Sequence, residues 1–389
     1  MPWHEVTTLT LRYEFVMLAQ SESCNFSSLC DRFSISRKTG YKWLKRYKQS
    51  GGAGLTDLSR RPHFSPLSTD AAIEDAVIDA REKFPAWGGR KLHTILVNQG
   101  CEGVPAPSTI TAILRRNGKL DPAEAAKHTA FERFEHPHPN DLWQMDFKGH
   151  FPMRQGRCHP LTVLDDHSRY SVLLKACAHE NTESVQQALT DAFRRYGLPY
   201  RMNMDNGSPW GNHGSKDLTV LTVWLMRLGI AVSHSRPYHP QTNGKDERFH
   251  RTLNLEAIKG RNFHDLADCQ QAFEQFRHCY NFVRPHESLQ MKTPGTRYQS
   301  SARSYPESLP PIEYPPGDEV RKVQGKGEFF FKGRVFRAPK ALSGYPIALR
   351  PTSEDGVYSV HFCHQKLKLV SLRQDEDDSK SVTHVPEQL

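Results

Sequence analysis

The sequence predicts a multidomain chain with helical units at the N-terminus, a central α/β core and a small β-barrel at the C-terminus. Three observations predict this order. Between residues 9 and 118, apolar side chains recur at helical spacing. Between residues 142 and 233, three short β-branched runs precede an alternation of helical and strand segments. Between residues 314 and 372, short β runs are separated by Gly and Pro turns.

The composition favours a partner with negative charge. The chain has 52 Lys and Arg against 43 Asp and Glu, which gives a net charge of +9 and a pI near 9.1. A surface of this sign attracts polyanions such as nucleic acid. The length of 389 residues exceeds one ordinary core, so we expect several domains.

Cysteine spacing and hydropathy argue against several classes of protein. The eight cysteines form neither a CxxC pair nor a zinc-finger spacing, so we expect reduced thiols and no structural zinc or disulfide scaffold. No stretch approaches 18 uninterrupted apolar residues, and the first residues lack the apolar segment of a secretory signal. The sequence therefore predicts a soluble protein that is not exported and has no membrane partner.

Residues 1–56 have the pattern of a helix-turn-helix unit. Its three helices are expected at residues 9–20, 27–33 and 37–50, with Ser27 and Ser36 as N-caps of the second and third. The third helix is strongly basic through Arg37, Lys38, Lys42, Lys45, Arg46 and Lys48. We expect these side chains to reach DNA bases and phosphates. A solvated basic face on a structural helix is the alternative.

Residues 57–66 have the Pro and Arg content of a linker. Within it, Arg60 and Arg61 would either enter a minor groove of DNA, as basic arms do, or remain solvated charges.

Residues 67–120 predict a second helix-turn-helix unit, whose last helix would be capped by Ser108 and stopped by Gly118. Its basic signal is weaker than that of the first unit, so structural packing is the alternative. Residues 121–139 have the character of an extended connector.

Residues 140–300 are expected to form the α/β core with a closing helix. The helix at residues 182–196 is the best marked, because its apolar residues line one face and Gly197 ends it. The strands are expected at residues 142–150, 160–165, 170–177, 201–205 and 230–233. Further helices are expected at residues 216–228 and around Glu247.

Three carboxylates of the core are candidates for a metal site. Asp146 and Asp205 lie at the ends of short apolar runs, whereas Glu247 opens a segment rich in helix formers. Carboxylate oxygens are the ligands that Mg²⁺ prefers. Two such ions, roughly 3.5–4 Å apart, stabilise the attacking and leaving oxygens of an in-line displacement at phosphorus. Acids brought together from distant parts of the chain would make that site.

The segments WQMDF, DNGSPW and HPQTNGKDERFHR carry these three acids. They resemble the signature segments of DDE transposases with a retroviral-integrase-type core, and the match is close to the transposases of bacterial insertion sequences. The resemblance implies an RNase H-like core. It also implies that Asp146, Asp205 and Glu247 are the catalytic residues and the ligands of two Mg²⁺ ions, with Mn²⁺ as the alternative metal.

The spacing of the last two acids departs from the family's pattern. Between Asp205 and Glu247 lie 41 residues, a few more than is usual in the family. We interpret residues 211–217 as an extra loop. The assignment of Glu247 therefore depends on the motif around it.

Other acids of the core compete with this triad. Asp165 and Asp166 also end a strand, but DDHSR has the composition of a hairpin turn, so we expect both to bond turn backbone groups. Asp246 precedes Glu247, and successive helix positions point about 100° apart, so the two cannot address the same metal pair. Only the resemblance selects Glu247.

Lys245, Arg248 and Arg251 recur at helical steps around Glu247. We expect Lys245 and Arg248 to face DNA. Pairing with local acids such as Glu247 and Glu256 is the alternative.

Residues 312–372 predict the small β-barrel, and the resemblance implies an SH3-like barrel that contacts DNA or a partner subunit. Phe329, Phe330 and Phe331 are consecutive, so strand alternation must turn one or two of them outward. The polar residues 373–389 predict a disordered tail.

The resemblance implies a DNA transposase that binds the ends of its mobile element, cleaves a strand there and transfers the freed 3′-OH into target DNA. Joining two ends implies a homo-oligomer, at least a dimer on DNA, and the expected location is the bacterial cytoplasm, at the nucleoid. Two alternatives stay open: a sequence-specific DNA-binding regulator with an inactive core, and an RNase H-type nuclease that cleaves without joining.

Overall fold

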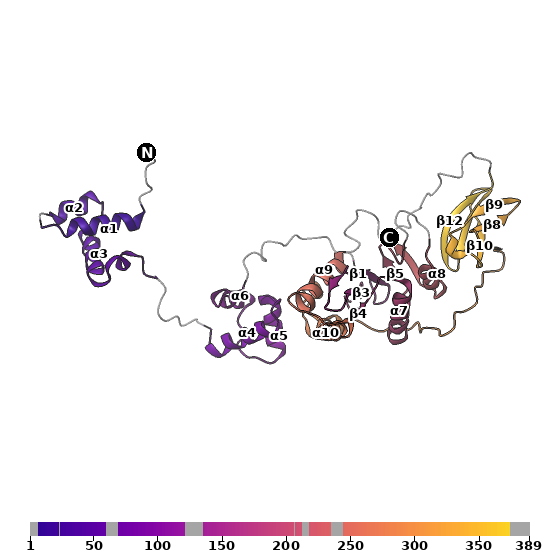
Figure 1. The fold of residues 1–389 in the computed structure, drawn as a ribbon, viewed down its shortest axis with the longest axis horizontal. Coiled ribbons are helices and arrows are strands. Elements are labelled where there is room, and N and C mark those ends of the chain that lie inside the picture. The colour runs from indigo at the N-terminus through magenta and orange to yellow at the C-terminus, as the bar shows by residue number, and fades with distance from the viewer. Residues whose placement is uncertain are drawn as a thin grey trace. The chain divides into compact units, whose positions relative to one another are not determined.

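The computed structural model describes residues 7–22, 24–59, 69–120, 135–205, 207–211, 218–234 and 244–373. The chain divides into two compact units, Met1–Ser68 and Thr69–Leu389, which Figure 1 shows as an indigo helical unit and the remaining domains. Within the described ranges, no helix is long and apolar enough to cross a membrane.

The first unit is a small helical bundle. Its elements are α1 (Thr8–Ala19), α2 (Phe26–Arg32), α3 (Arg37–Ser50) and the 3₁₀ turn η1 (Gly51–Leu55). Ser36 caps α3 as predicted, because its side chain accepts a hydrogen bond from the Thr39 N–H. The predicted cap Ser27 is wrong: α2 is capped by Asn25, two residues earlier in the sequence. The buried residues are Phe15, Val16, Leu29, Cys30, Trp43 and Leu55.

The second unit begins with three helices, α4 (Ala71–Lys83), α5 (Gly89–Asn98) and α6 (Pro107–Arg116). The predicted cap Ser108 is wrong, because Pro107 occupies the first position of α6, where its missing N–H is not needed. The apolar cluster of these helices also packs against Cys279 and Val283 of the core. This helical part is therefore attached to the core and does not stand apart from it.

The core contains one mixed sheet. Its strands are β1 (Leu142–Phe147), β2 (Phe151–Pro152), β3 (Arg157–Asp165), β4 (Ser171–Cys177), β5 (Arg201–Met204) and β6 (Ala231–His234). The order is β2-β3-β1-β5-β6, with β4 paired to β3. β1 runs antiparallel to β3 and parallel to β5. The antiparallel strands followed by parallel ones confirm the predicted α/β core. The short strand β2 was not predicted from the sequence.

Helices cover both faces of this sheet (Figure 1). They are α7 (Thr182–Tyr196), α8 (Val220–Arg227), α9 (Gly244–Leu253) and α10 (Leu266–His278). Residues of α7 and α8 share one apolar cluster with Trp143 and Met145 of β1. Residues of α9 and α10 share the other with Leu164 and Leu174. α9 and α10 each continue into a π-helical turn, Asn254–Ile258 and Cys279–Val283.

The C-terminal part forms two antiparallel sheets. β7 (Glu319–Lys322), β10 (Pro346–Pro351), β11 (Val357–Phe362) and β12 (Gln365–Ser371) make one, and β8 (Glu328–Phe331) with β9 (Arg334–Arg337) make the other. Phe329 and Phe331 are buried while Phe330 is 60% exposed, as strand alternation predicts. The Gln365 side chain bonds the backbone N–H and C=O of Val232, on the edge strand β6. Residues 374–389, predicted to be disordered, lie outside the described residues.

Candidate active site

Asp146 and Asp205 lie at the same edge of the sheet. The parallel register of β1 and β5 pairs Trp143 with Met202 and Gln144 with Asn203. Asp146 follows two residues after Gln144 on β1, and Asp205 is the first residue after the end of β5. The charge of Asp205 acts on the Asp146 carboxyl, which agrees with this placement. Two carboxylates that are 59 residues apart in sequence are therefore neighbours.

The Asp146 carboxyl holds its proton to a higher pH than an ordinary aspartate does. Its side chain is 25% exposed. Burial, and next the negative charge of Asp205, raise the pKa of Asp146 to about 7, against a smaller opposing effect of the Phe147 N–H. Glu180 and Glu247 add smaller effects in the same direction. A cation bound between these carboxylates would relieve the repulsion.

Asp146 has a neutral histidine beside it. His250 Nδ1 lies 4.0 Å from Asp146 Oδ2, and His250 Nε2 lies 2.8 Å from Thr162 Oγ1. The Thr162 hydroxyl also donates to the Asp146 carbonyl, at 2.9 Å. Burial and the charge of Lys148 lower the pKa of His250 to about 4, so its ring is neutral at pH 7. The sequence analysis missed His250, although it lies one helical turn after Glu247.

The Asp205 carboxylate is held by groups that follow it in sequence. The Gly207 N–H donates to Asp205 Oδ1 at 2.9 Å, and the Trp210 indole N–H donates to the same oxygen. Trp210 is buried and stacks on Phe147 of β1, with ring centroids 5.3 Å apart. A Cβ on residue 207 would lie 3.1 Å from Asp205 Oδ2, which explains the glycine. The sequence analysis also missed Trp210.

Helix α9 places its two adjacent acids in different environments. Asp246 is 1% exposed, whereas Glu247 is exposed. Burial and the charge of Asp146 raise the pKa of Asp246 well above its usual value, and its Oδ1 has no hydrogen-bond partner within the described part of the chain. Among the described residues, no group of three or more His, Cys, Asp or Glu side chains is arranged to hold a metal ion. The strands thus bring two acids together, and α9 presents the third towards solvent.

Asp165 and Asp166 are fixed by hydrogen bonds. Asp165 accepts from the Ser168 N–H at 2.8 Å, as predicted for a turn, and from the Asn140 N–H at 2.7 Å. Asp166 differs from the prediction, because it pairs with Lys245 of α9 in place of turn groups. Lys245 is correspondingly turned inward, with 19% of its side chain exposed, and the prediction that it faces DNA is not supported. Arg248 is exposed.

On α3, five of the six basic residues predicted to reach DNA are exposed: Arg37, Lys38, Lys42, Lys45 and Lys48. Arg46 has a structural partner, since its guanidinium donates to the Thr56 carbonyl at 2.8 Å and lies over the Trp43 ring. Arg60 and Arg61 lie outside the described residues. The exposed positive charge of α3 therefore comes from its lysines and Arg37.

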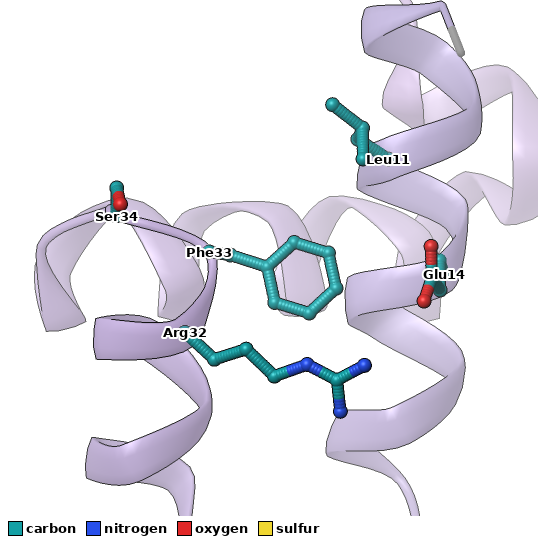
Figure 2. Close-up of a pocket in the computed structure, with 5 residues that line it drawn as sticks. All are labelled: Leu11, Glu14, Arg32, Phe33 and Ser34. Atoms are coloured by element: carbon teal, nitrogen blue, oxygen red, sulfur yellow. The ribbon is translucent and has the colours of Figure 1, made fainter.

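The first unit also has a pocket of about 360 Å³ between α1 and the end of α2. Figure 2 shows Arg32 and Phe33 reaching from α2 towards Leu11 and Glu14 on α1. The lining of this pocket includes one acid, Glu14, and one base, Arg32. It therefore offers no pair of carboxylates for metal chemistry.

Family comparisons agree with this architecture. Two models described as integrase core domain match residues 136–240 and 228–294, and the C-terminal domain of the IS481 family transposases matches residues 318–378. A helix-turn-helix domain matches residues 11–63, and a homeodomain-like domain matches residues 39–114. The fold and these matches define an integrase-core protein with DNA-binding helical domains.

Two relatives from bacterial mobile elements resemble the chain over most of its length. It is 26% identical to a 39.2 kDa protein of insertion element IS476 from Xanthomonas euvesicatoria, over 66% of this chain and 73% of that protein. It is 24% identical to the transposase for transposon Tn552 from Staphylococcus aureus, over 71% of this chain and 64% of that protein, slightly under two thirds of its length. The chain is thus similar to proteins of bacterial mobile elements, one of them a transposase, and it carries the matches to the integrase core domain.

Two solved structures from retroviruses resemble the chain. The integrase of a simian T-cell lymphotropic virus intasome, in complex with PP2A regulatory subunit B56 gamma, is 18% identical with a TM-score of 0.37, over 76% of this chain and 99% of that chain. The HTLV-2 integrase catalytic core domain, in complex with magnesium, is 17% identical with a TM-score of 0.33, over 42% and 99%. Because both scores lie below 0.5, the fold assignment rests on the sheet topology and the family matches.

Proposed function

We propose that this chain is a transposase that binds the ends of its element and uses Asp146, Asp205 and Glu247 for strand cleavage and 3′-OH strand transfer. The observation that carries the proposal is that β1 and β5 are parallel neighbours and that Asp146, on β1, feels the negative charge of Asp205, the residue after β5. α9 contacts β1, and its exposed Glu247 adds a smaller effect on Asp146. Glu247 is chosen over Asp246 because a fully buried carboxylate has no access to DNA.

The donor set fits divalent metal ions. Asp146 and Asp205 repel each other, and hard oxygen ligands suit Mg²⁺, with Mn²⁺ as a close substitute. We propose that Asp146, Asp205 and Glu247 hold two such ions. When bound, they would neutralise charge on the reacting phosphate.

In this proposal the protein side chains orient the reacting groups, and none of them acts as the nucleophile. Water attacks the phosphodiester at the element's end, and the 3′-oxygen leaves with a proton as a free hydroxyl. That hydroxyl then attacks a target phosphodiester and loses its proton as a new P–O bond forms, while the target's own 3′-oxygen leaves and is protonated, which breaks the target strand. Trp210 and Gly207 orient the Asp205 carboxylate, while neutral His250 and Thr162 flank Asp146.

End recognition is proposed for the helical units. The exposed cations of α3 would contact phosphates and base edges. Two ends must meet for joining, so the active species is proposed to be at least a dimer on DNA, in the bacterial cytoplasm. The exposed Arg248 on α9 would contact the DNA backbone beside Glu247.

The test is a joining assay with labelled DNA from the element's ends, a target plasmid and Mg²⁺. Wild type should yield covalent joint molecules, and Glu247→Gln should yield none while binding the ends with unchanged affinity. Asp246→Asn is the matched control and should keep most of the activity. The reverse result for these two variants would assign the third carboxylate to Asp246.

Two other outcomes would support the alternatives. Cleavage without joint molecules would indicate a nuclease. Specific binding without strand breakage by wild type would indicate a regulator.

A further inference from the structure

The first turn of α9 is tied to the core by a buried ion pair. Lys245 Nζ contacts Asp166 Oδ1, and Asp166 is 3% exposed. Glu247 follows Lys245 by two positions, which corresponds to roughly 200° around the helix. Holding Lys245 against the core therefore fixes the rotation that turns Glu247 away from it.

Asp166 has partners on other segments as well. The Gln144 side chain donates to Asp166 Oδ1 at 2.8 Å, and the His136 N–H donates to Oδ2 at 2.9 Å. Gln144 lies on β1, two residues before Asp146 and on the same face. His136 belongs to the segment that enters the core from the helical units. One carboxylate thus joins the strand of Asp146, the helix of Glu247 and the entering chain.

A second set of ion pairs holds the entering segment nearby. Glu135 accepts from Arg169 at 3.2 Å and from Arg297 at 2.8 Å, and Arg297 also lies 3.0 Å from His167 Nε2. Arg169 and His167 belong to the same turn as Asp166. The partners of Asp166 are consequently fixed themselves, which favours one position of its carboxylate.

We infer that Asp166 and Lys245 are positioning residues for the proposed reaction: their ion pair sets the rotation and place of α9, and thereby the distance of Glu247 from Asp146 and Asp205. The inference rests on the proposed function. The physical reason is that a buried charge has few acceptable partners, so the pair forms in one geometry. Outer groups that orient metal ligands commonly change activity or metal affinity about 10–100-fold when removed.

The test uses Lys245→Met, which keeps the aliphatic length, Lys245→Arg, which keeps the charge, and Asp166→Asn. Single-turnover cleavage of end DNA should fall about 10–100-fold in Lys245→Met and Asp166→Asn, and Lys245→Arg should recover at least part of the rate. The Mg²⁺ concentration for half-maximal rate should rise in both slow variants. The affinity for end DNA should stay within about twofold. Asp318→Asn is the matched control, because Asp318 pairs with Arg350 in the C-terminal sheets.

A second readout does not depend on activity. Hydrogen exchange of residues 244–253 should speed up in Lys245→Met and Asp166→Asn but not in Asp318→Asn. If wild type neither cleaves nor joins DNA, the proposed function fails while this readout still tests the ion pair. A loss of DNA affinity as large as the loss of rate in Lys245→Met would make Lys245 a DNA contact and overturn the inference. Unchanged exchange and unchanged rate in both variants would also overturn it.

Discussion

At the residue scale, the candidate site is a set of acids with different surroundings. Asp146 is partly buried and faces another carboxylate, Asp205 receives two N–H donors, and Glu247 is exposed. Asp246 is buried without a partner for one oxygen within the described residues. These surroundings separate acids that look equivalent in the sequence.

The raised pKa of Asp146 predicts a pH-dependent stability of the metal-free protein. The folded protein holds this proton up to about pH 7, whereas the unfolded chain releases it near pH 4. The contribution to folding is therefore complete below about pH 4 and is lost as the pH rises to about 7. The Asp146→Asn variant should not lose folding stability over this pH range. Its melting temperature should exceed that of wild type by about 2–6 °C at pH 8 and by much less at pH 4.

Thermal melts in EDTA across this pH range measure the difference. In Asp205→Asn, the loss of stability with rising pH should occur at lower pH than in wild type, because the largest charge acting on Asp146 is removed. A difference between Asp146→Asn and wild type that does not change with pH would contradict the raised pKa.

Trp210 gives a second prediction at this scale. Trp210→Phe keeps a ring against Phe147 but removes the N–H that donates to Asp205. We expect a loss of about 1–3 kcal/mol in unfolding free energy and a cleavage rate about tenfold lower. Trp224→Phe is the control, since Trp224 packs in the same cluster on α8. Equal effects of the two changes on the cleavage rate would show that Trp210 acts through packing alone.

At the element scale, the basic residues of α3 are of two kinds: exposed side chains and a side chain with structural partners. Lys45 is exposed, whereas Arg46 binds the Thr56 carbonyl and lies over Trp43. Gly40, on the inner face of α3, has no room for a side chain, because a Cβ there would lie 2.8 Å from Cys30 Sγ. The inner face thus packs closely and the outer face remains free for a partner.

This division predicts different effects for neighbouring lysine and arginine changes. Lys45→Ala should weaken end-DNA binding and reduce the slope of log affinity against log salt by about 1, with an unchanged melting temperature. Arg46→Ala should lower the melting temperature of the first unit. Anisotropy titrations at several salt concentrations, together with thermal melts, test both. A salt slope unaffected by Lys45→Ala would remove α3 from the DNA interface.

At the scale of the whole molecule, the chain consists of two units with separate cores. Residues 1–68 form one unit around Phe15 and Trp43, and residues 69–389 form the other. The second helical unit belongs to the larger body, since its apolar cluster includes Cys279 and Val283.

Separate cores predict separate folding. A fragment of residues 1–68 should fold alone, with a helical circular dichroism spectrum and a cooperative melt. A fragment of residues 69–389 should melt within a few degrees of the same transition in the full chain. Loss of cooperative melting in either fragment would mean that the units depend on each other.

The local pattern of the sequence was sufficient for much of this molecule. The predicted helices at residues 182–196 and 37–50 have the observed bounds, because apolar periodicity and capping residues are local properties. The strands near the two aspartates were also predicted, at residues 142–150 and 201–205, but β1 ends earlier, at Phe147, and β5 ends at Met204, just before Asp205. The motif around Glu247 selected one acid of α9, and that choice remains a proposal.

Only the tertiary structure decided which way the polar side chains of the site turn. Lys245 pairs with Asp166 from a distant turn, Asp246 is buried, and Trp210 donates to Asp205. The Lys245–Asp166 pair and the burial of Asp246 depend on where β1, β3 and α9 pack, whereas the Trp210 contact joins residues only five apart whose side-chain directions the sequence does not give. Sequence by itself determined which segments form helices and strands and where charge accumulates. Packing decided which charges remain exposed and which pair inside the core, since a buried charge must find its partner within the fold.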